Sequence, residues 1–220
     1  MTIQFSDIQD HWAEDCITQL AERNLIQGYK DGSFKPEQTL TRAEFSALLQ
    51  AAFPETEKTR EPIAFNDLEE EHWAFAAIQF AYQTGFLSGY PEQLFKPDIS
   101  MPRVQAIAAL ASGLGYEAPE EGKALLEEHF DDATEIPDYA VEAIAAAVQA
   151  KLVTYYPETK ELKPNQAVTR GELAALLCQA LEVQNESIAV ANSIRTLQQE
   201  PTPSFRAANQ SPSIAYECDS

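Results

Sequence analysis

One group of short motifs occurs three times along the chain, in the same order each time. It opens with Phe-x-Asp at Phe5, Phe65 and Phe130. It continues with an aromatic-Ala pair, a Gly-Tyr or Tyr-Tyr pair, and a Phe- or Leu-x-Pro element. It closes on four residues that always include an arginine, namely Thr41-Arg42-Ala43-Glu44, Pro102-Arg103-Val104-Gln105 and Thr169-Arg170-Gly171-Glu172. A repeat of this length indicates structural modules that stack on one another and share a core.

The hydrophobic pattern between the motifs predicts helices. In the first copy, apolar residues recur at helical spacing after Trp12 and again after Thr41, which predicts a helix, a loop and a second helix. We expect Gly28 to end the first helix in the left-handed conformation that glycine adopts at low cost. Because the later copies repeat the pattern, the predicted fold class is all-α, with three tandem helix-loop-helix modules.

The closing motif predicts how the second helix of a module begins. Thr41 and Glu44 are spaced as a capping box, in which the hydroxyl accepts a backbone N–H three residues on and the carboxylate accepts the N–H of the threonine. Thr169 and Glu172 repeat this structural cap. Pro102 has no hydroxyl, so the box is broken in the second copy.

The arginine of the motif recurs at a place where a helix does not favour it. The first turn lies at the positive end of the helix dipole, which prefers a carboxylate to a guanidinium group. Arg42, Arg103 and Arg170 are therefore either salt-bridged to one of the many carboxylates of the chain or retained to bind a ligand.

These motifs, above all the string from Phe5 to Glu44, closely resemble the S-layer homology module, and the resemblance covers roughly residues 3–182. It implies a pseudo-threefold, all-helical spindle with a groove between neighbouring modules. It also implies that the grooves bind a secondary cell-wall polysaccharide or another peptidoglycan-linked glycan, often one that carries a pyruvyl carboxylate. On this interpretation the protein anchors itself to the cell wall and is not an enzyme.

The resemblance also implies which residues contact the glycan. A guanidinium can bind a carboxylate through two parallel hydrogen bonds. An indole can stack on the apolar face of a sugar, although packing in the core explains the tryptophans equally well. The expected ligand-binding residues are Arg42, Arg103, Arg170, Trp12, Trp73, Gly28, Tyr29, Gly89 and Tyr90. Since the first module matches the family best, we expect the groove that uses Arg42 to bind best.

The spacing of the motifs divides the chain into four parts. The predicted modules are residues 1–60, 61–118 and 119–183, and an acidic segment at the start of the third is expected to add a short helix. Residues 184–220 are rich in Ser, Gln, Asn and Pro, which predicts a flexible, disordered tail of low complexity. A weak helical pattern spans residues 188–197 within it.

Composition and charge exclude several functions. The net charge of −20 argues against nucleic acid and anionic lipid as partners. No segment approaches the ~20 apolar residues of a membrane span, so we expect no membrane insertion. Cys16, Cys178 and Cys218 give no disulfide framework or metal-ligand spacing, and the first two are predicted to be buried. Because there is also no phosphate loop or nucleophile motif, we expect no cofactor and no catalysis.

The N-terminus raises an alternative function. It lacks the basic and apolar segments of a signal peptide. The family resemblance predicts the cell envelope or cell surface, whereas the N-terminus favours the cytoplasm. The alternative is therefore an intracellular protein–protein interaction module, in which the same fold binds a protein partner.

Overall fold

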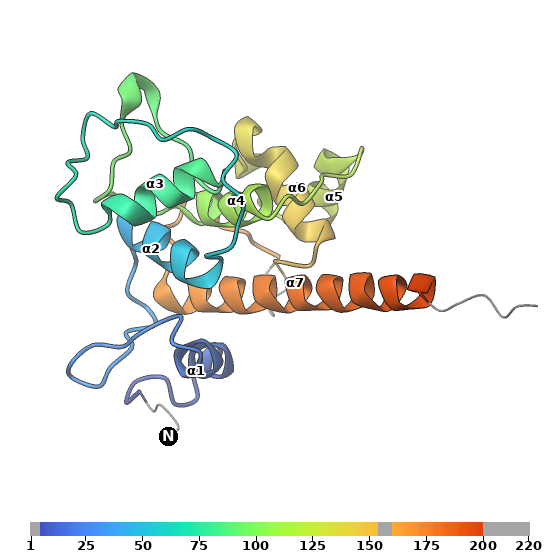
Figure 1. The fold of residues 1–220 in the computed structure, drawn as a ribbon, viewed down its shortest axis with the longest axis horizontal. Helices are drawn as coiled ribbons and strands as arrows, with labels where there is room; N and C mark the ends of the chain where they lie inside the picture. Colours follow the sequence, from blue (N-terminus) through green and yellow to red (C-terminus); the bar gives the residue numbers. More distant parts are fainter. Residues whose placement is uncertain (1–4, 154–159, 200–220) are drawn as a thin grey trace, which may run out of the picture. The chain divides into compact units, whose positions relative to one another are not determined.

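The computed structural model describes residues 5–153 and 160–199. The chain divides into two compact units, residues 1–185 and 186–220, and every site considered below lies in the first unit. The described residues form seven α-helices and no β-sheet, which confirms the predicted all-α fold class (Figure 1).

The order of the helices follows the repeat. The first module holds α1 and α2, the second α3 and α4, and the third α6 and the first part of α7. An additional helix, α5, lies in the acidic segment where the sequence predicts one. The α-helices are α1 Glu14–Glu22, α2 Arg42–Ala52, α3 Phe75–Gln83, α4 Arg103–Gly113, α5 Gly122–His129, α6 Val141–Gln149 and α7 Arg170–Gln199. Three short 3-10 helices are η1 Pro91–Gln93, η2 Ala133–Glu135 and η3 Asp138–Ala140.

A closed cycle of backbone hydrogen bonds joins the three modules. It is formed by Leu40, Met101 and Val168, each of which lies two positions before a motif arginine. The Leu40 N–H donates to the Val168 carbonyl at 3.4 Å, Val168 to Met101 at 2.8 Å, and Met101 to Leu40 at 3.0 Å. All three side chains are fully buried. The cycle relates the modules by a pseudo-threefold axis.

The first N–H groups of the second helices are also satisfied by a cycle between modules, which runs in the opposite order. Such groups have no acceptor within their own helix. In each module the N–H of the motif arginine donates to a carbonyl of the next module, and the third module donates back to the first. The three bonds are Arg42 to Ile99 at 3.0 Å, Arg103 to Gln166 at 2.8 Å and Arg170 to Gln38 at 2.9 Å.

The aspartate of each Phe-x-Asp motif fixes the loop before the second helix. Asp7 accepts the backbone N–H groups of Phe34 and Lys35, both at 2.7 Å. Asp67 and Asp132 form the same two bonds in the second and third modules. Lys35 has a left-handed φ of 59°, which is uncommon for a residue other than glycine. The carboxylate stabilises this turn with two charge-assisted hydrogen bonds.

Gly28 does not end the first helix, so that prediction is wrong. The helix ends at Glu22, and the left-handed residue beyond it is Asn24, with φ of 59°. Asparagine tolerates this conformation, so the helix stops before the glycine is reached. Gly28 is instead required for packing, because a Cβ at this position would lie 2.3 Å from the ring of Phe5. Gly89 takes the equivalent place in the second module.

Packing between the modules produces one core. Helix α2 packs against α3, and α4 packs against α6 (Figure 1). On the remaining boundary, Cys16 of α1 meets Cys178 of α7, and both are free, buried thiols as the sequence predicts. Their hydrogen bond, together with burial, raises the pKa of Cys16. The buried apolar residues of all three modules form a single cluster, as expected of repeats that cannot bury their apolar faces alone.

Part of the predicted disordered tail is helical, which corrects that prediction. Helix α7 continues to Gln199 and therefore includes residues 184–199. This stretch has no glycine or proline to stop a helix that has already begun in the third module. The weak helical pattern at residues 188–197 was the correct signal. Residues 200–220, including Cys218, lie outside the described residues.

Candidate functional site

Arg42 reaches from the first module into the loop of the second. Its Nε donates to the carbonyl of Phe95 at 2.9 Å, its Nη2 to the carbonyl of Ser88 at 3.0 Å, and its Nη1 to Oε1 of Gln105 at 3.1 Å. The guanidinium carbon lies 4.8 Å from the ring centroid of Tyr90 and 4.5 Å from that of Phe95. Since an arginine has five N–H groups, contacts with the described residues leave two for a ligand.

At the other two module boundaries, Arg103 and Arg170 likewise reach into the loop of the next module. The Nε of Arg103 donates to the carbonyl of Leu162 at 2.8 Å, and that of Arg170 to the carbonyl of Phe34 at 2.9 Å. Arg170 also lies over the Phe34 ring, at 4.4 Å. All three arginines therefore stabilise the module boundaries, a role that sequence reasoning did not include.

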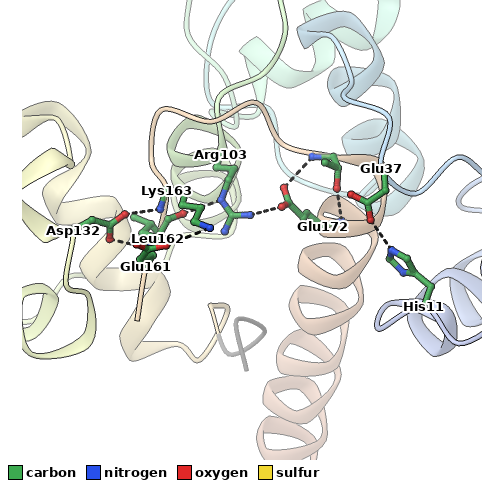
Figure 2. Close-up of polar contacts among 9 residues, drawn as sticks. His11, Glu37, Arg103, Asp132, Glu161, Leu162, Lys163 and Glu172 are labelled. Carbon is green, nitrogen blue, oxygen red and sulfur yellow. Dashed lines mark hydrogen bonds and ion pairs between the residues drawn. The ribbon is translucent and has the colours of Figure 1, made fainter. Parts of the chain in front are cut away.

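At two of the three module boundaries, the last residue of the closing motif contacts the arginine of the preceding module and so sets the charge beside it. Arg103 forms an ion pair of 2.8 Å with Glu172, and the two side chains are 3% and 12% exposed (Figure 2). The predicted salt bridge is thus confirmed for Arg103. The equivalent of Glu172 in the second module is Gln105, which gives Arg42 a neutral acceptor. Burial lowers the pKa of Arg42, although an arginine remains charged at neutral pH.

The threonine and glutamate of the closing motif form caps. The Glu44 N–H donates to Thr41 Oγ1 at 3.2 Å, and the Thr41 N–H donates to Glu44 Oε2 at 2.7 Å. Thr169 and Glu172 form the same pair of bonds. Glu172 therefore uses one carboxylate oxygen for the cap and the other for Arg103. Pro102 forms no side-chain cap.

A cavity of about 410 Å³ opens at Arg42. Tyr90 and Gln105 line it from the second module, Tyr139 from the third, and Arg60 from the end of the first. We call this cavity the Arg42 groove. Two guanidinium groups and no carboxylate belong to its described lining, although the chain as a whole has a net charge of −20. The groove is thus a positive site on an acidic protein.

The space beside Arg103 is different in size and charge. Between the described residues it holds only about 20 Å³. Its lining includes Trp12, Leu152 and Glu172, and the glutamate neutralises the arginine. Residues 154–159, which contain the third Tyr-Tyr pair, lie outside the described residues. The described part of this boundary therefore offers neither the room nor the free charge of the Arg42 groove.

The aromatic residues before the first helices are on the surface. Trp12, Trp73 and Tyr139 are 47%, 66% and 68% exposed, so the interpretation of the tryptophans as core residues is wrong. The alanine that follows each aromatic residue is buried in its place. Tyr139 lines the Arg42 groove, Trp12 lines the space beside Arg103, and Trp73 lines neither. An exposed aromatic ring beside a cavity can stack on a sugar.

The predicted ligand-binding residues are divided among three places. Arg42, Gly89 and Tyr90 come together in the Arg42 groove. Arg103 and Trp12 meet at the second boundary. Arg170 lies 5.2 Å from the ring of Tyr29 at the third boundary. Gly28 packs against Phe5.

Sequence reasoning missed three residues of the Arg42 groove, namely Tyr139, Arg60 and Gln105. Tyr139 stands where the other modules have Trp12 and Trp73, and that position was its signal. Arg60 is the last residue of the predicted first module and lies outside every motif, so no pattern marks it. Gln105 did have a signal, because its motif alone among the three ends in a neutral amide. That difference indicated a loss of the cap and also decides the charge beside Arg42.

In the part of the chain that the structure describes, no cluster of His, Cys, Asp and Glu side chains could hold a metal ion. In the same part, no helix has the length and apolar character needed to cross a membrane.

Comparison with known proteins identifies the repeat. The family model described as S-layer homology domain matches residues 4–46, 64–99 and 129–174. The chain is 30% identical to Exoglucanase XynX of Acetivibrio thermocellus over 84% of this chain and 17% of that protein. It is 33% identical to the Cellulosome-anchoring protein of the same organism over 51% of this chain and 26% of that protein. It is 25% identical to the Surface-layer 125 kDa protein of Lysinibacillus sphaericus over 78% of this chain and 14% of that protein. The chain thus spans about a quarter or less of these relatives.

Proposed function

The chain belongs to the S-layer homology domain family, and from that premise we propose that it attaches non-covalently to a cell wall by binding an anionic wall glycan in the Arg42 groove. The proposed ligand is a polysaccharide linked to peptidoglycan whose sugars carry a carboxylate, such as a pyruvyl ketal. The chain binds this polymer and catalyses no reaction. Its place of action is the cell envelope.

The observation that carries the proposal is the state of Arg42. Its guanidinium is held by three hydrogen bonds and two aromatic rings, is only 2% exposed, and lines a cavity without a carboxylate. Because the guanidinium group is already held in one orientation, binding a ligand costs less side-chain conformational entropy than it would at a mobile arginine. A bidentate guanidinium–carboxylate contact in such a place is strong and directional.

The size and lining of the groove also favour a sugar. A volume of about 410 Å³ falls within the range of small-molecule sites. Tyr139 is largely exposed at the groove and can stack on the apolar face of a pyranose ring. The relatives support attachment at the cell surface, since their names include a cellulosome-anchoring and a surface-layer protein. The enzymes among them share only a small part of their length with this chain.

Cosedimentation with isolated cell walls tests the proposal. The purified protein is mixed with walls of the organism that produces it, before and after chemical removal of the wall-linked polysaccharide. We expect the protein to pellet with the untreated walls and to stay in the supernatant with the stripped walls. Because the contact is ionic, pelleting should decrease as the salt concentration rises. Serum albumin, another acidic protein, serves as a control for non-specific adsorption.

Two results would contradict the proposal. Equal pelleting with both wall preparations would mean that the polysaccharide is not the ligand. A protein that stays in the supernatant with untreated walls would favour the alternative, a fold that binds a protein partner.

A further inference from the structure

We propose that Gln105 and Arg60 determine the specificity of the Arg42 groove, so that it selects an anionic glycan over the same glycan without its charge. This inference rests on the proposed function. It adds Arg60, which lies outside the closing motif, and Gln105, which stands where the other two closing motifs have a glutamate. Gln105 leaves the charge of Arg42 available to the ligand, and Arg60 adds a second positive charge at the same cavity.

The role of Gln105 follows from a comparison within the chain. Gln105 and Glu172 occupy the same position of the closing motif, and each contacts the arginine of the preceding module through Nη1, at 3.1 and 2.8 Å. Glu172 supplies a carboxylate, so the charge of Arg103 is neutralised within the protein. Gln105 supplies only an amide oxygen, which also accepts the Tyr90 hydroxyl at 3.3 Å. At the Arg42 groove, therefore, the carboxylate partner has to come from the ligand.

The position of Arg60 follows from its contacts with the second module. Its backbone N–H donates to the carbonyl of Gln83 at 3.0 Å, and its guanidinium carbon lies 5.4 Å from the ring centroid of Tyr82. Its Nη1 lies 3.3 Å from both the carbonyl of Leu87 and the hydroxyl of Ser88. The carbonyl of the same Ser88 accepts Nη2 of Arg42.

The two guanidinium groups therefore both contact Ser88 and line one cavity. Arg42 is buried and held by the protein on three nitrogens. Arg60 is exposed, and among the described residues only its Nη1 is within hydrogen-bond distance of an acceptor. Its Nε and Nη2 can turn to a ligand, and its charge adds to that of Arg42 where no carboxylate screens either.

Isothermal titration with soluble wall polysaccharide tests this inference. The probes are the isolated polymer and the same polymer after carbodiimide activation and borohydride reduction, which converts its carboxylates to alcohols. We expect the wild-type protein to bind the acidic polymer at least about tenfold more tightly than the reduced one. Gln105→Glu should lower the affinity for the acidic polymer about tenfold or more, because the new carboxylate pairs with Arg42 as Glu172 pairs with Arg103. Arg60→Gln should lower it roughly two- to fivefold, as expected of an exposed cation.

Matched variants separate these effects from changes in total charge. Gln19→Glu and Arg23→Gln change exposed residues of the first module that do not line the groove, and both should bind as the wild type does. Gln105→Glu restores the residue found in the other two motifs, so we expect its denaturation midpoint to equal or exceed that of the wild type. Unfolding is therefore not expected to explain weaker binding.

The outcomes distinguish this inference from the proposed function. If the wild type binds neither polymer, the proposed function fails and the inference fails with it. If the wild type binds but Gln105→Glu and Arg60→Gln match it, anchoring stands and the two residues do not determine specificity. Equal binding of the acidic and reduced polymers by the wild type also overturns the inference and leaves anchoring intact.

Discussion

Arg42→Gln is expected to lower the affinity of the protein for acidic wall polysaccharide by about 30-fold or more. Removing one partner of a buried, hydrogen-bonded charge pair typically costs ~2–5 kcal/mol of binding free energy, and each 1.4 kcal/mol is about a factor of ten. The substitution removes the only buried cation of the described groove lining. The measurement is isothermal titration of both proteins with the isolated polymer.

Two further variants show whether the loss comes from the missing charge or from a disturbed fold. Arg42→Lys keeps the charge but cannot form the fork of parallel hydrogen bonds, so its affinity should be intermediate. Arg23→Gln makes the same change of charge at an exposed site and should bind normally. Circular dichroism must show that each variant is folded at the temperature of the titration. A folded Arg42→Gln protein with wild-type affinity would remove Arg42 from the site.

Phe95→Ala should lower the free energy of unfolding by about 3–5 kcal/mol, the usual cost of deleting a buried phenylalanine ring. Phe95 is fully buried, its ring centroid lies 5.3 Å from that of Phe65, and it supports the guanidinium of Arg42. This loss is a large part of the ~5–15 kcal/mol that stabilises a typical domain. Urea denaturation followed by circular dichroism measures it.

Trp73→Ala is the matched control for the loss of an aromatic ring. Trp73 occurs in the same module but is 66% exposed, so its removal should change the free energy of unfolding by only about 0.5 kcal/mol or less. A similar loss in both variants would mean that the ring of Phe95 does not support the module boundary. A difference of several kcal/mol would agree with the packing described here.

The repeat predicted most of the fold because its motifs are local. Helix positions follow from apolar spacing, and the capping boxes follow from pairs of residues three apart, so both can be recognised in a single segment. The cycle through Leu40, Met101 and Val168 could not be predicted in this way. It consists of backbone bonds between residues far apart in the sequence, and backbone groups leave no mark on residue type.

The errors have equally specific causes. Gly28 is conspicuous in a loop, but its small size is needed beside Phe5, whereas a less conspicuous asparagine ends the helix. The tryptophans are large and apolar, which favours the core. The adjacent alanines, which directly precede the first helices of the first two modules, are buried instead.

The candidate site was predictable only in part. The sequence marked the motif arginines, and the prediction that the groove with Arg42 binds best stays a prediction. It rested on the well-preserved first module, whereas the structural features that support this groove are the altered motif of the second module and Arg60, outside every motif. Whether an arginine is neutralised depends on which module contacts which, and this order is a property of the folded chain.

The pelleting of wild-type protein with walls that differ only in their carboxylates tests the central claim most directly. One portion of the walls is left untreated, and in the other the carboxylates of the polysaccharide are reduced to alcohols while the polymer is retained. The Arg42 groove predicts that the protein pellets with the first portion and remains largely in the supernatant with the second. Equal pelleting with both would contradict recognition of an anionic glycan by this groove.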